Sequence, residues 1–195
     1  MTPPHDSRRE VRILREAASI HVIALLSVFE VASGRLIIVF PFMKYNLDTL
    51  LHRDALTGAQ IKSHLQDMFR ALSYVHSLGV IHRDVKLSNI LLNSPAGPAY
   101  LADFGISWKD GVSSSEPATE KIGDVGTTCY RPPELLFGSR EYDTSLDLWA
   151  AGCVVAETVE MNHKPLFDSG PLGSELSLIQ SIFKTLELPL KRCGL

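Results

Sequence analysis

The eight residues from His82 to Asn89, which read HRDVKLSN, constrain this 195-residue chain more than any other stretch. They place a carboxylate at Asp84, an amine at Lys86 and an amide at Asn89 on one short loop, and a DFG sequence begins 19 residues after Asp84. Taken alone, each of these residues is best interpreted as a solvated charge or a capping side chain in a surface turn. The spaced set instead predicts side chains that converge on phosphate and metal.

This pattern resembles the eukaryotic protein kinases, whose catalytic loop reads HRDxKxxN and whose metal-binding loop reads DFG. Phosphoryl transfer develops charge on oxygen atoms, so the enzyme needs a carboxylate that deprotonates the acceptor hydroxyl and cations that hold the phosphates. The resemblance implies that Asp84 is the base and that Lys86 steadies the phosphoryl group of ATP. It also implies that Asn89 and Asp103 hold Mg²⁺, because oxygen donors suit a hard cation.

The same resemblance gives structural or regulatory roles to residues around the two motifs. It places Asp147 where kinases brace the backbone of the catalytic loop, and Pro132-Pro133-Glu134 where they usually have APE. The residues that it marks as structural or regulatory are Glu10, His82, Arg83, Phe104, Gly105, Glu134 and Asp147.

Residues 109–126 are rich in Ser, Gly, Asp and Glu, which predicts a mobile loop. In the resemblance this loop is the activation segment, and it ends in the sequence GTTCYRPPE of residues 126–134. The resemblance assigns Thr127 to a hydrogen bond with the base and with Lys86.

Phosphorylation of this segment is left open by the sequence. The resemblance assigns Arg83 to a phosphate on the segment, but the position of the phosphothreonine of cyclin-dependent kinases falls on Ile122. Thr119 and Ser115 are nearby hydroxyl groups that offer a substitute.

Residues 4–18 are predicted to be helical, because Val11, Leu14 and Ala18 recur at helical spacing and Pro4 suits a helix start. This expectation carries no function by itself.

The segment PHDSRRE, residues 4–10, is similar to the PSTAIRE segment of cyclin-dependent kinases. It keeps Pro4, Arg9 and Glu10, and Arg8 stands where those kinases offer Ile to a cyclin. The resemblance makes this the regulatory helix and leaves a cyclin-like regulatory subunit as an open partner. The alternative for Glu10 is a solvated charge on an exposed helix face.

Two apolar runs, residues 24–29 and 36–40, are joined through Ser33-Gly34 and predict a β-hairpin. In the resemblance Phe40 is the gatekeeper and Pro41 to Met43 form the hinge whose backbone meets adenine. The alternative is an ordinary buried strand end.

Two longer helices are predicted further along the chain. Residues 58–77 carry an apolar stripe at steps of three and four, and Gly79 ends that helix. From Thr144 the sequence predicts a capping box that includes Asp147, followed by a helix over residues 148–156 that is apolar on all sides and therefore buried.

The expected fold is α+β and protein-kinase-like. Residues 1–42 are predicted to form a partial small lobe of one helix and a hairpin, and residues 43–195 a partial, mainly helical C-lobe. No Gly-rich loop and no Lys precede Lys44, so the resemblance covers the middle of the kinase catalytic domain. A nucleotide pocket without its roof is expected to bind Mg-ATP poorly.

Composition narrows the partners and the compartment. The net charge of −3 and the pI near 6.1 give no electrostatic reason to expect nucleic acid or an anionic membrane. Three cysteines without paired spacing indicate reduced thiols, in the cytoplasm or nucleus, and no apolar run reaches the ~18 residues of a membrane span.

Two functions fit these observations. The first is a cyclin-dependent-kinase-like serine/threonine kinase acting on a protein substrate, because KLSN after HRD favours Ser/Thr over Tyr. The second is a non-catalytic, kinase-like binding module. A binding module has no physical need of Asp84, Lys86, Asn89 and Asp103 together, which favours the first.

Overall fold

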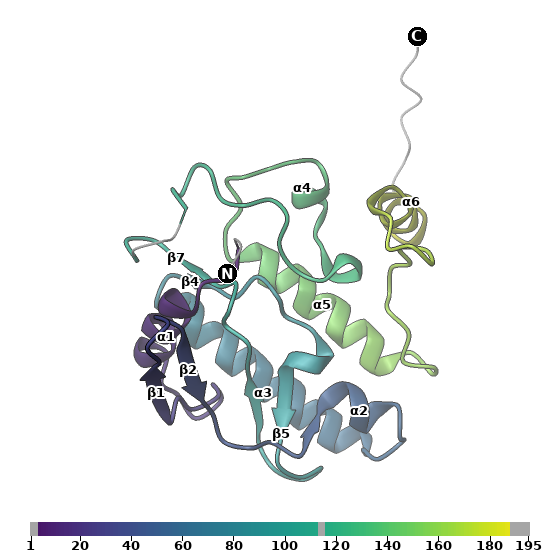
Figure 1. Ribbon diagram of the computed structural model, residues 1–195. Coiled ribbons are helices and arrows are strands. Elements are labelled where there is room, and N and C mark those ends of the chain that lie inside the picture. The colour runs from purple at the N-terminus through teal and green to yellow at the C-terminus, as the bar shows by residue number, and fades with distance from the viewer. Residues whose placement is uncertain (1–3, 113–115, 188–195) are drawn as a thin grey trace.

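The computed structural model describes residues 4–112 and 116–187 as an α+β fold built mainly on helices (Figure 1). The helices are α1 (Ser7–Glu16), α2 (Leu47–Leu51), α3 (Gly58–Ser77), α4 (Pro133–Leu136), α5 (Ser145–Val159) and α6 (Glu175–Thr185). The strands are β1 (Ser27–Glu30), β2 (Leu36–Val39), β3 (Tyr45–Asn46), β4 (Val80–Ile81), β5 (Ile90–Leu92), β6 (Ala99–Leu101) and β7 (Trp108–Lys109).

Helix α3 has the predicted bounds because its ends carry strong local signals. At its start, the Thr57 hydroxyl accepts a hydrogen bond from the Gln60 amide while the Gln60 side chain accepts one from the Thr57 amide. At its end, Gly79 takes a left-handed conformation with φ of +73° and turns the chain into β4. The helix therefore delivers the chain to the loop at residues 82–89.

Short antiparallel strands set the catalytic loop and the DFG sequence side by side. Strand β4 pairs with β7 in the register Ile81 to Trp108, and β5 pairs with β6 in the register Ile90 to Leu101. Strand β4 leads into the catalytic loop and β5 leaves it, while β6 leads into the DFG sequence and β7 follows it. Because β4 pairs with β7 and β5 pairs with β6, the catalytic loop and the DFG sequence lie next to each other.

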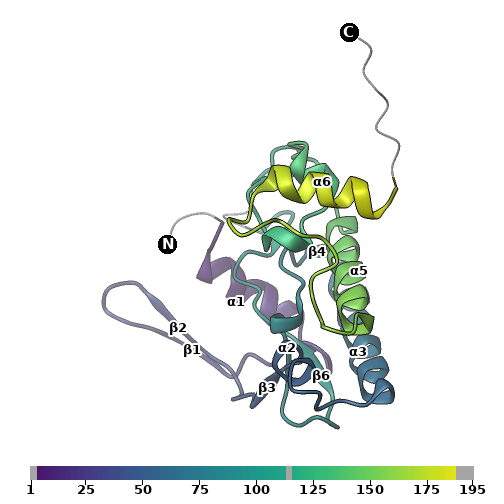
Figure 2. The ribbon, with the colours of Figure 1, turned by 90° about the vertical axis from the view of Figure 1, so that its right-hand side faces the viewer.

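The main hydrophobic core lies between α3, the β3–β5–β6 sheet and the inner faces of α1, α2 and α5. The antiparallel β1–β2 hairpin extends away from this body (Figure 2). Hydrophobic side chains on the hairpin, such as Phe29 and Ile37, are exposed. The predicted hairpin and the kinase-like fold class are present, while the division of the chain after residue 42 stays a prediction.

Three sequence expectations about helices are wrong in detail. The first helix ends at Glu16, so Ala18 lies beyond it and is exposed, and Ile13 and Ala17 are buried instead. Thr144 makes no side-chain capping bond at the start of α5. Residues 148–156 of α5 are not buried on all sides, because Leu148 is 51% exposed while Ala151 and Val154 are buried.

None of the helices in the described residues is long and apolar enough to cross a membrane.

Replacing Gly79 by Ala tests the left-handed end of α3. Its φ of +73° is unfavourable for a residue with a Cβ, although the space around it is open. We expect Gly79→Ala to lower the free energy of unfolding by about 1 kcal/mol. Urea unfolding followed by circular dichroism measures the change. Gly58→Ala, also in open space but at the helical start of α3, is the matched control and is expected to be neutral or slightly stabilising. Equal losses in the two variants would contradict the account.

Candidate active site

Asp147 of α5 holds the backbone of the catalytic loop. Its Oδ2 accepts a hydrogen bond from the His82 amide and its Oδ1 accepts one from the Arg83 amide, both at 2.8 Å. The His76 ring contacts Oδ2 at 2.8 Å, and the Asp147 side chain is fully buried. Arg83 has a φ of +72°, so the carboxylate stabilises a strained turn. The Asp147 carboxylate thus contacts the backbone of the catalytic loop, and the bracing role that the resemblance implies stays a prediction.

His82 and Phe104 join the catalytic loop to the DFG sequence. The His82 ring contacts the carbonyl oxygen of Ala102 at 3.0 Å, and it meets the Phe104 ring edge-on with 4.7 Å between centroids. The Ser107 hydroxyl donates to the carbonyl oxygen of His82. Because His82 and Phe104 are buried, these contacts fix the two motifs against the same core.

Asp84, Lys86 and Thr127 form one hydrogen-bonded group. Lys86 Nζ lies 2.8 Å from Asp84 Oδ2 and donates to Thr127 Oγ1 at 2.9 Å. The Thr127 hydroxyl and amide donate to Asp84 Oδ1 at 2.8 and 3.1 Å. Thr127 therefore contacts both the candidate base and the candidate lysine, and its role in catalysis stays a prediction.

These contacts set the charge of Asp84. Burial by itself would raise the pKa of this carboxyl group, but the hydrogen bonds from Lys86 and Thr127 and the charge of Lys86 outweigh burial and hold the pKa below its usual range. Asp84 is consequently ionised at neutral pH and has the protonation state that a proton acceptor needs.

Gly126 lets the activation segment approach the catalytic loop. Its φ is +75°, and a Cβ at this position would lie 2.8 Å from the carbonyl oxygen of Arg83. A larger residue would push Thr127 away from Asp84.

Asn89 links Asp84 to the side of the site that contains Asp103. Its Nδ2 donates to the carbonyl oxygen of Asp84 at 2.8 Å and to Asp84 Oδ2 at 3.1 Å. These two bonds engage the amide nitrogen, which is the atom of the Asn89 side chain that could not bind a cation. Asn89 and Asp103 line the same cavity.

Asn89 and Asp103 fit a divalent cation by their chemistry. An amide oxygen and a carboxylate on neighbouring segments suit Mg²⁺, which is usually held by one or two protein oxygens together with phosphate and water. Asp103 has a φ of +66° and its Oδ1 accepts a hydrogen bond from the Gly105 amide at 3.4 Å. The strained backbone turns this carboxylate toward the cavity side of the loop.

The cavity beside Asn89 and Asp103 has a volume of about 270 Å³. Phe40 lines it, as predicted for the gatekeeper, but Pro41 and Met43 are not among its lining residues. Met43 packs against the main hydrophobic core instead. Small-molecule sites usually measure roughly 300–1,000 Å³, so this cavity is small for a nucleotide.

Comparison with known proteins agrees with this geometry. The sequence matches the family model described as the protein kinase domain over residues 2–191. The chain belongs to the protein kinase family. It is also 38% identical over 184 residues to the CTD kinase subunit alpha of Schizosaccharomyces pombe (strain 972 / ATCC 24843). These matches confirm the expected cyclin-dependent-kinase-like membership.

The match with the CTD kinase subunit covers 93% of this chain and 30% of the relative. The chain thus spans about a third of the length of the curated relative that it matches.

Glu10 lines the same cavity as Asp103. An added Cβ on Gly105 would lie 3.3 Å from Asp103 Oδ1 and 3.8 Å from Glu10 Oε2, so both carboxylates border that glycine. Burial, and then the nearby charge of Asp103, raise the pKa of Glu10 to about 7. Glu10 is half-buried and lines this cavity, so it does not stand on an exposed helix face. None of the described residues that line the cavity is basic.

The activation segment is more anchored than its composition predicted. Val125 and Lys121 are buried, and the Lys121 ammonium lies over the rings of Trp108 and Tyr142 at 4.7 and 5.3 Å. Ile122 packs against the second hydrophobic cluster, and its carbonyl oxygen accepts a hydrogen bond from the Tyr142 hydroxyl at 2.7 Å. Ser115 lies outside the described residues.

Sequence reasoning missed the partner of Arg83. The guanidinium group pairs with Glu116, with its Nη2 at 2.8 Å from Oε2. The missed signal was that a buried Arg requires an anion and that the segment contains acidic residues besides its hydroxyl groups.

Glu134 lies in the first turn of α4, where its carbonyl oxygen accepts a hydrogen bond from the Ser139 amide.

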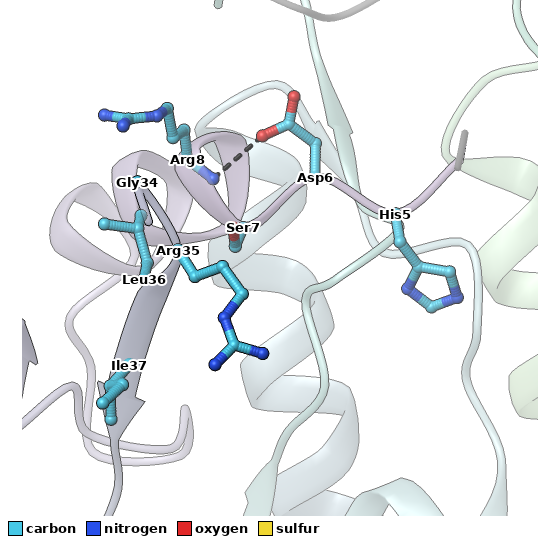
Figure 3. Close-up of a pocket in the computed structure, with 8 residues that line it drawn as sticks. All are labelled: His5, Asp6, Ser7, Arg8, Gly34, Arg35, Leu36 and Ile37. Carbon is cyan, nitrogen blue, oxygen red and sulfur yellow. Dashed lines mark hydrogen bonds between the residues drawn. The ribbon is translucent and has the colours of Figure 1, made fainter. Parts of the chain in front are cut away.

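A separate cavity of about 590 Å³ lies between the start of α1 and the hairpin. Figure 3 shows its two walls, residues 5–8 and residues 34–37. Asp84, Asn89 and Asp103 do not line it, so we do not assign the chemistry to this space.

Removing the Asp147 carboxylate tests its hold on the catalytic loop. Asp147→Ala leaves two buried amides without an acceptor, and we expect a loss of about 3 kcal/mol or more in unfolding free energy. Asp143→Ala is the matched control, since this exposed carboxylate accepts one bond from the Ser145 amide near the start of α5 and its loss costs about 1 kcal/mol or less. Chemical denaturation measures both, and a similar small loss in each would refute the bracing role.

Glu10→Gln tests the electrostatic cost at the cavity. Because the folded pKa of about 7 exceeds the ordinary value of 4.5, the cost of the ionised carboxylate is absent below about pH 4.5 and grows as the pH rises to about 7. In metal-free protein we expect Glu10→Gln to stabilise the fold at pH 8 by roughly 1–3 kcal/mol, and to have little effect at pH 4.5. Thermal unfolding across this pH range checks the prediction, and stabilisation that is independent of pH would exclude the electrostatic cause.

Proposed function

We propose that this chain carries the phosphoryl-transfer centre of a serine/threonine protein kinase. The reaction would pass the terminal phosphoryl group of ATP to a Ser or Thr hydroxyl of a protein substrate. The observation that supports this most is the group formed by Asp84, Lys86 and Thr127, in which an ionised carboxylate and an amine are held within 2.8 Å of each other. A binding surface has no chemical use for that arrangement.

The residues divide the work by their position. Asp84 orients the acceptor hydroxyl and takes its proton, and Thr127 keeps one carboxylate oxygen of Asp84 in place. Lys86 places a positive charge next to the same carboxylate, where it offsets charge that develops on the transferred group. Asn89 and Asp103 would hold Mg²⁺, which neutralises charge on the phosphates when it is bound.

The preference for Ser and Thr over Tyr rests on the resemblance, in which the sequence KLSN after HRD favours Ser/Thr. Lys86, the first residue of that sequence, lies 2.8 Å from Asp84 and donates a hydrogen bond to Thr127 of the activation segment.

A non-catalytic binding or regulatory module is the second candidate. The observation that favours it is the cavity of about 270 Å³, which borders two carboxylates, Glu10 and Asp103, and has no basic lining residue in the described part of the chain. Phosphates bind poorly beside uncompensated negative charge. This candidate predicts protein binding without turnover.

The relative's printed name describes a subunit, and a cyclin-like regulatory subunit is the corresponding proposal for this chain. Helix α1 is the surface that the resemblance assigns to such a partner. Arg8, at the position of the cyclin-facing Ile, is exposed there and pairs with Glu30 of β1 at 2.6 Å. We also propose that the protein lies in the cytoplasm or nucleus, because its three cysteines have no paired spacing.

A phosphorylation assay with Mg-ATP and a generic protein substrate tests the catalytic proposal. We expect the 195-residue chain to turn over more slowly than about 1 per second, because its cavity is small, and Asp84→Asn to lower that rate roughly 100- to 10,000-fold. Asp110→Asn is the matched control, because it makes the same Asp-to-Asn change at an exposed residue that follows β7. This variant should retain the rate of the parent chain. Equal rates for the Asp84 variant and the parent chain would favour the binding module.

A further inference from the structure

Two buried arginines from different parts of the fold meet one carboxylate of the activation segment. Arg9 comes from α1 and Arg83 from the catalytic loop, and their side chains are 2% and 0% exposed. Glu116 is 13% exposed and lies 2.8 Å from the Arg83 Nη2 and 3.6 Å from the Arg9 Nη1. A second contact of 3.5 Å between Arg83 Nη1 and Glu116 Oε1 makes the Arg83 pair forked.

The backbone of Glu116 is fixed as well as its side chain. The indole nitrogen of Trp108 donates to the carbonyl oxygen of Glu116 at 2.9 Å. The Arg83 guanidinium is in turn held over the Tyr142 ring, 5.3 Å from its centroid. Both the backbone and the side chain of Glu116 are therefore held in place, whereas a residue of a solvated loop is mobile.

We propose that Glu116 is a positioning residue for phosphoryl transfer, a permanent carboxylate that orders the activation segment and the catalytic loop without a phosphate. The inference rests on the proposed kinase function. A guanidinium taken out of water needs an anion beside it, and Glu116 supplies that anion from the sequence itself.

The position of Ile122 supports this inference independently. Ile122 has no hydroxyl group, and it packs into the second hydrophobic cluster at the position that the resemblance assigns to the phosphothreonine. The segment is thus held by the packing of Ile122 and by the ion pair of Glu116 with Arg83. Neither contact requires phosphorylation.

Glu116 reaches the reacting centre through the two arginines. Arg83 stands between His82 and Asp84 with a φ of +72°, so holding its side chain fixes the orientation of the Asp84 backbone. Arg9 precedes Glu10, which faces the cavity beside Asp103. One carboxylate consequently joins the segment to both sides of the candidate site.

A stability test with anion rescue examines Glu116 without relying on turnover. We expect Glu116→Ala and Glu116→Gln to lower the melting temperature by roughly 5–10 °C, and Glu116→Asp to lose less because it keeps the charge. Acetate or inorganic phosphate, compared with chloride at equal ionic strength, should restore part of the loss in Glu116→Ala. Glu120→Ala, an exposed acid in the same segment, is the matched control.

A rate measurement on the same variants tests the positioning role. Where the parent protein phosphorylates its substrate, Glu116→Ala should lower kcat roughly 10- to 100-fold with little change in KM for ATP, and Glu116→Asp should recover much of the rate. Prior treatment of the parent with a protein phosphatase should leave its rate unchanged.

The outcomes separate the two proposals. An inactive parent whose Glu116→Ala variant still shows acetate rescue would remove the kinase proposal and keep Glu116 as the anchoring carboxylate. A melting temperature for Glu116→Ala equal to that of Glu120→Ala, or a parent rate that falls tenfold or more after phosphatase treatment, would overturn the inference about Glu116.

Discussion

The candidate site depends on a fully buried carboxylate that accepts two backbone amides. Asp147 lies in the first turn of α5 and binds the amides of His82 and Arg83, which belong to a loop more than sixty residues earlier. Buried amides without an acceptor are costly, so the loop cannot leave this position cheaply. The left-handed turn at Arg83, and with it the direction of Asp84, follows from this contact.

From this anchor the site extends outward through short contacts. Asp84 binds Thr127 of the activation segment, Asn89 joins Asp84 to the cavity shared with Asp103, and Arg83 binds Glu116. Each contact connects segments far apart in the chain, so several elements position one small region. Preorganised groups of this kind suit a reaction whose rate comes mainly from positioning and electrostatic stabilisation.

The sequence predicted the elements whose signals are local. The start and end of α3 were predictable because Thr57, Gln60 and Gly79 act on their immediate neighbours. The spaced set around Asp84 was predictable for a similar reason, because its members share one loop. Helix α5 is buried only in part, and the sequence could not show which part, since an apolar sequence does not say which of its faces a neighbour covers.

The pairing of Arg83 with Glu116 could not be predicted because it joins residues 33 positions apart across a segment without periodicity. The composition of that segment indicated a solvated loop. In the structure, Trp108 binds the backbone of Glu116 and Tyr142 packs under Arg83, and these contacts hold the two charged side chains together. The raised pKa of Glu10 likewise depends on its burial in the folded chain and then on the charge of Asp103, which is distant in the sequence.

The most direct measurement is a crystal structure of the chain with Mn²⁺ and a non-hydrolysable ATP analogue, with the metal located by anomalous scattering. The account predicts metal bonded to Asn89 Oδ1 and to the Asp103 carboxylate at about 2.1 Å, with Asp84 facing the terminal phosphate. Metal bound elsewhere, or an Asp84 carboxylate that faces away from the phosphates, would contradict it.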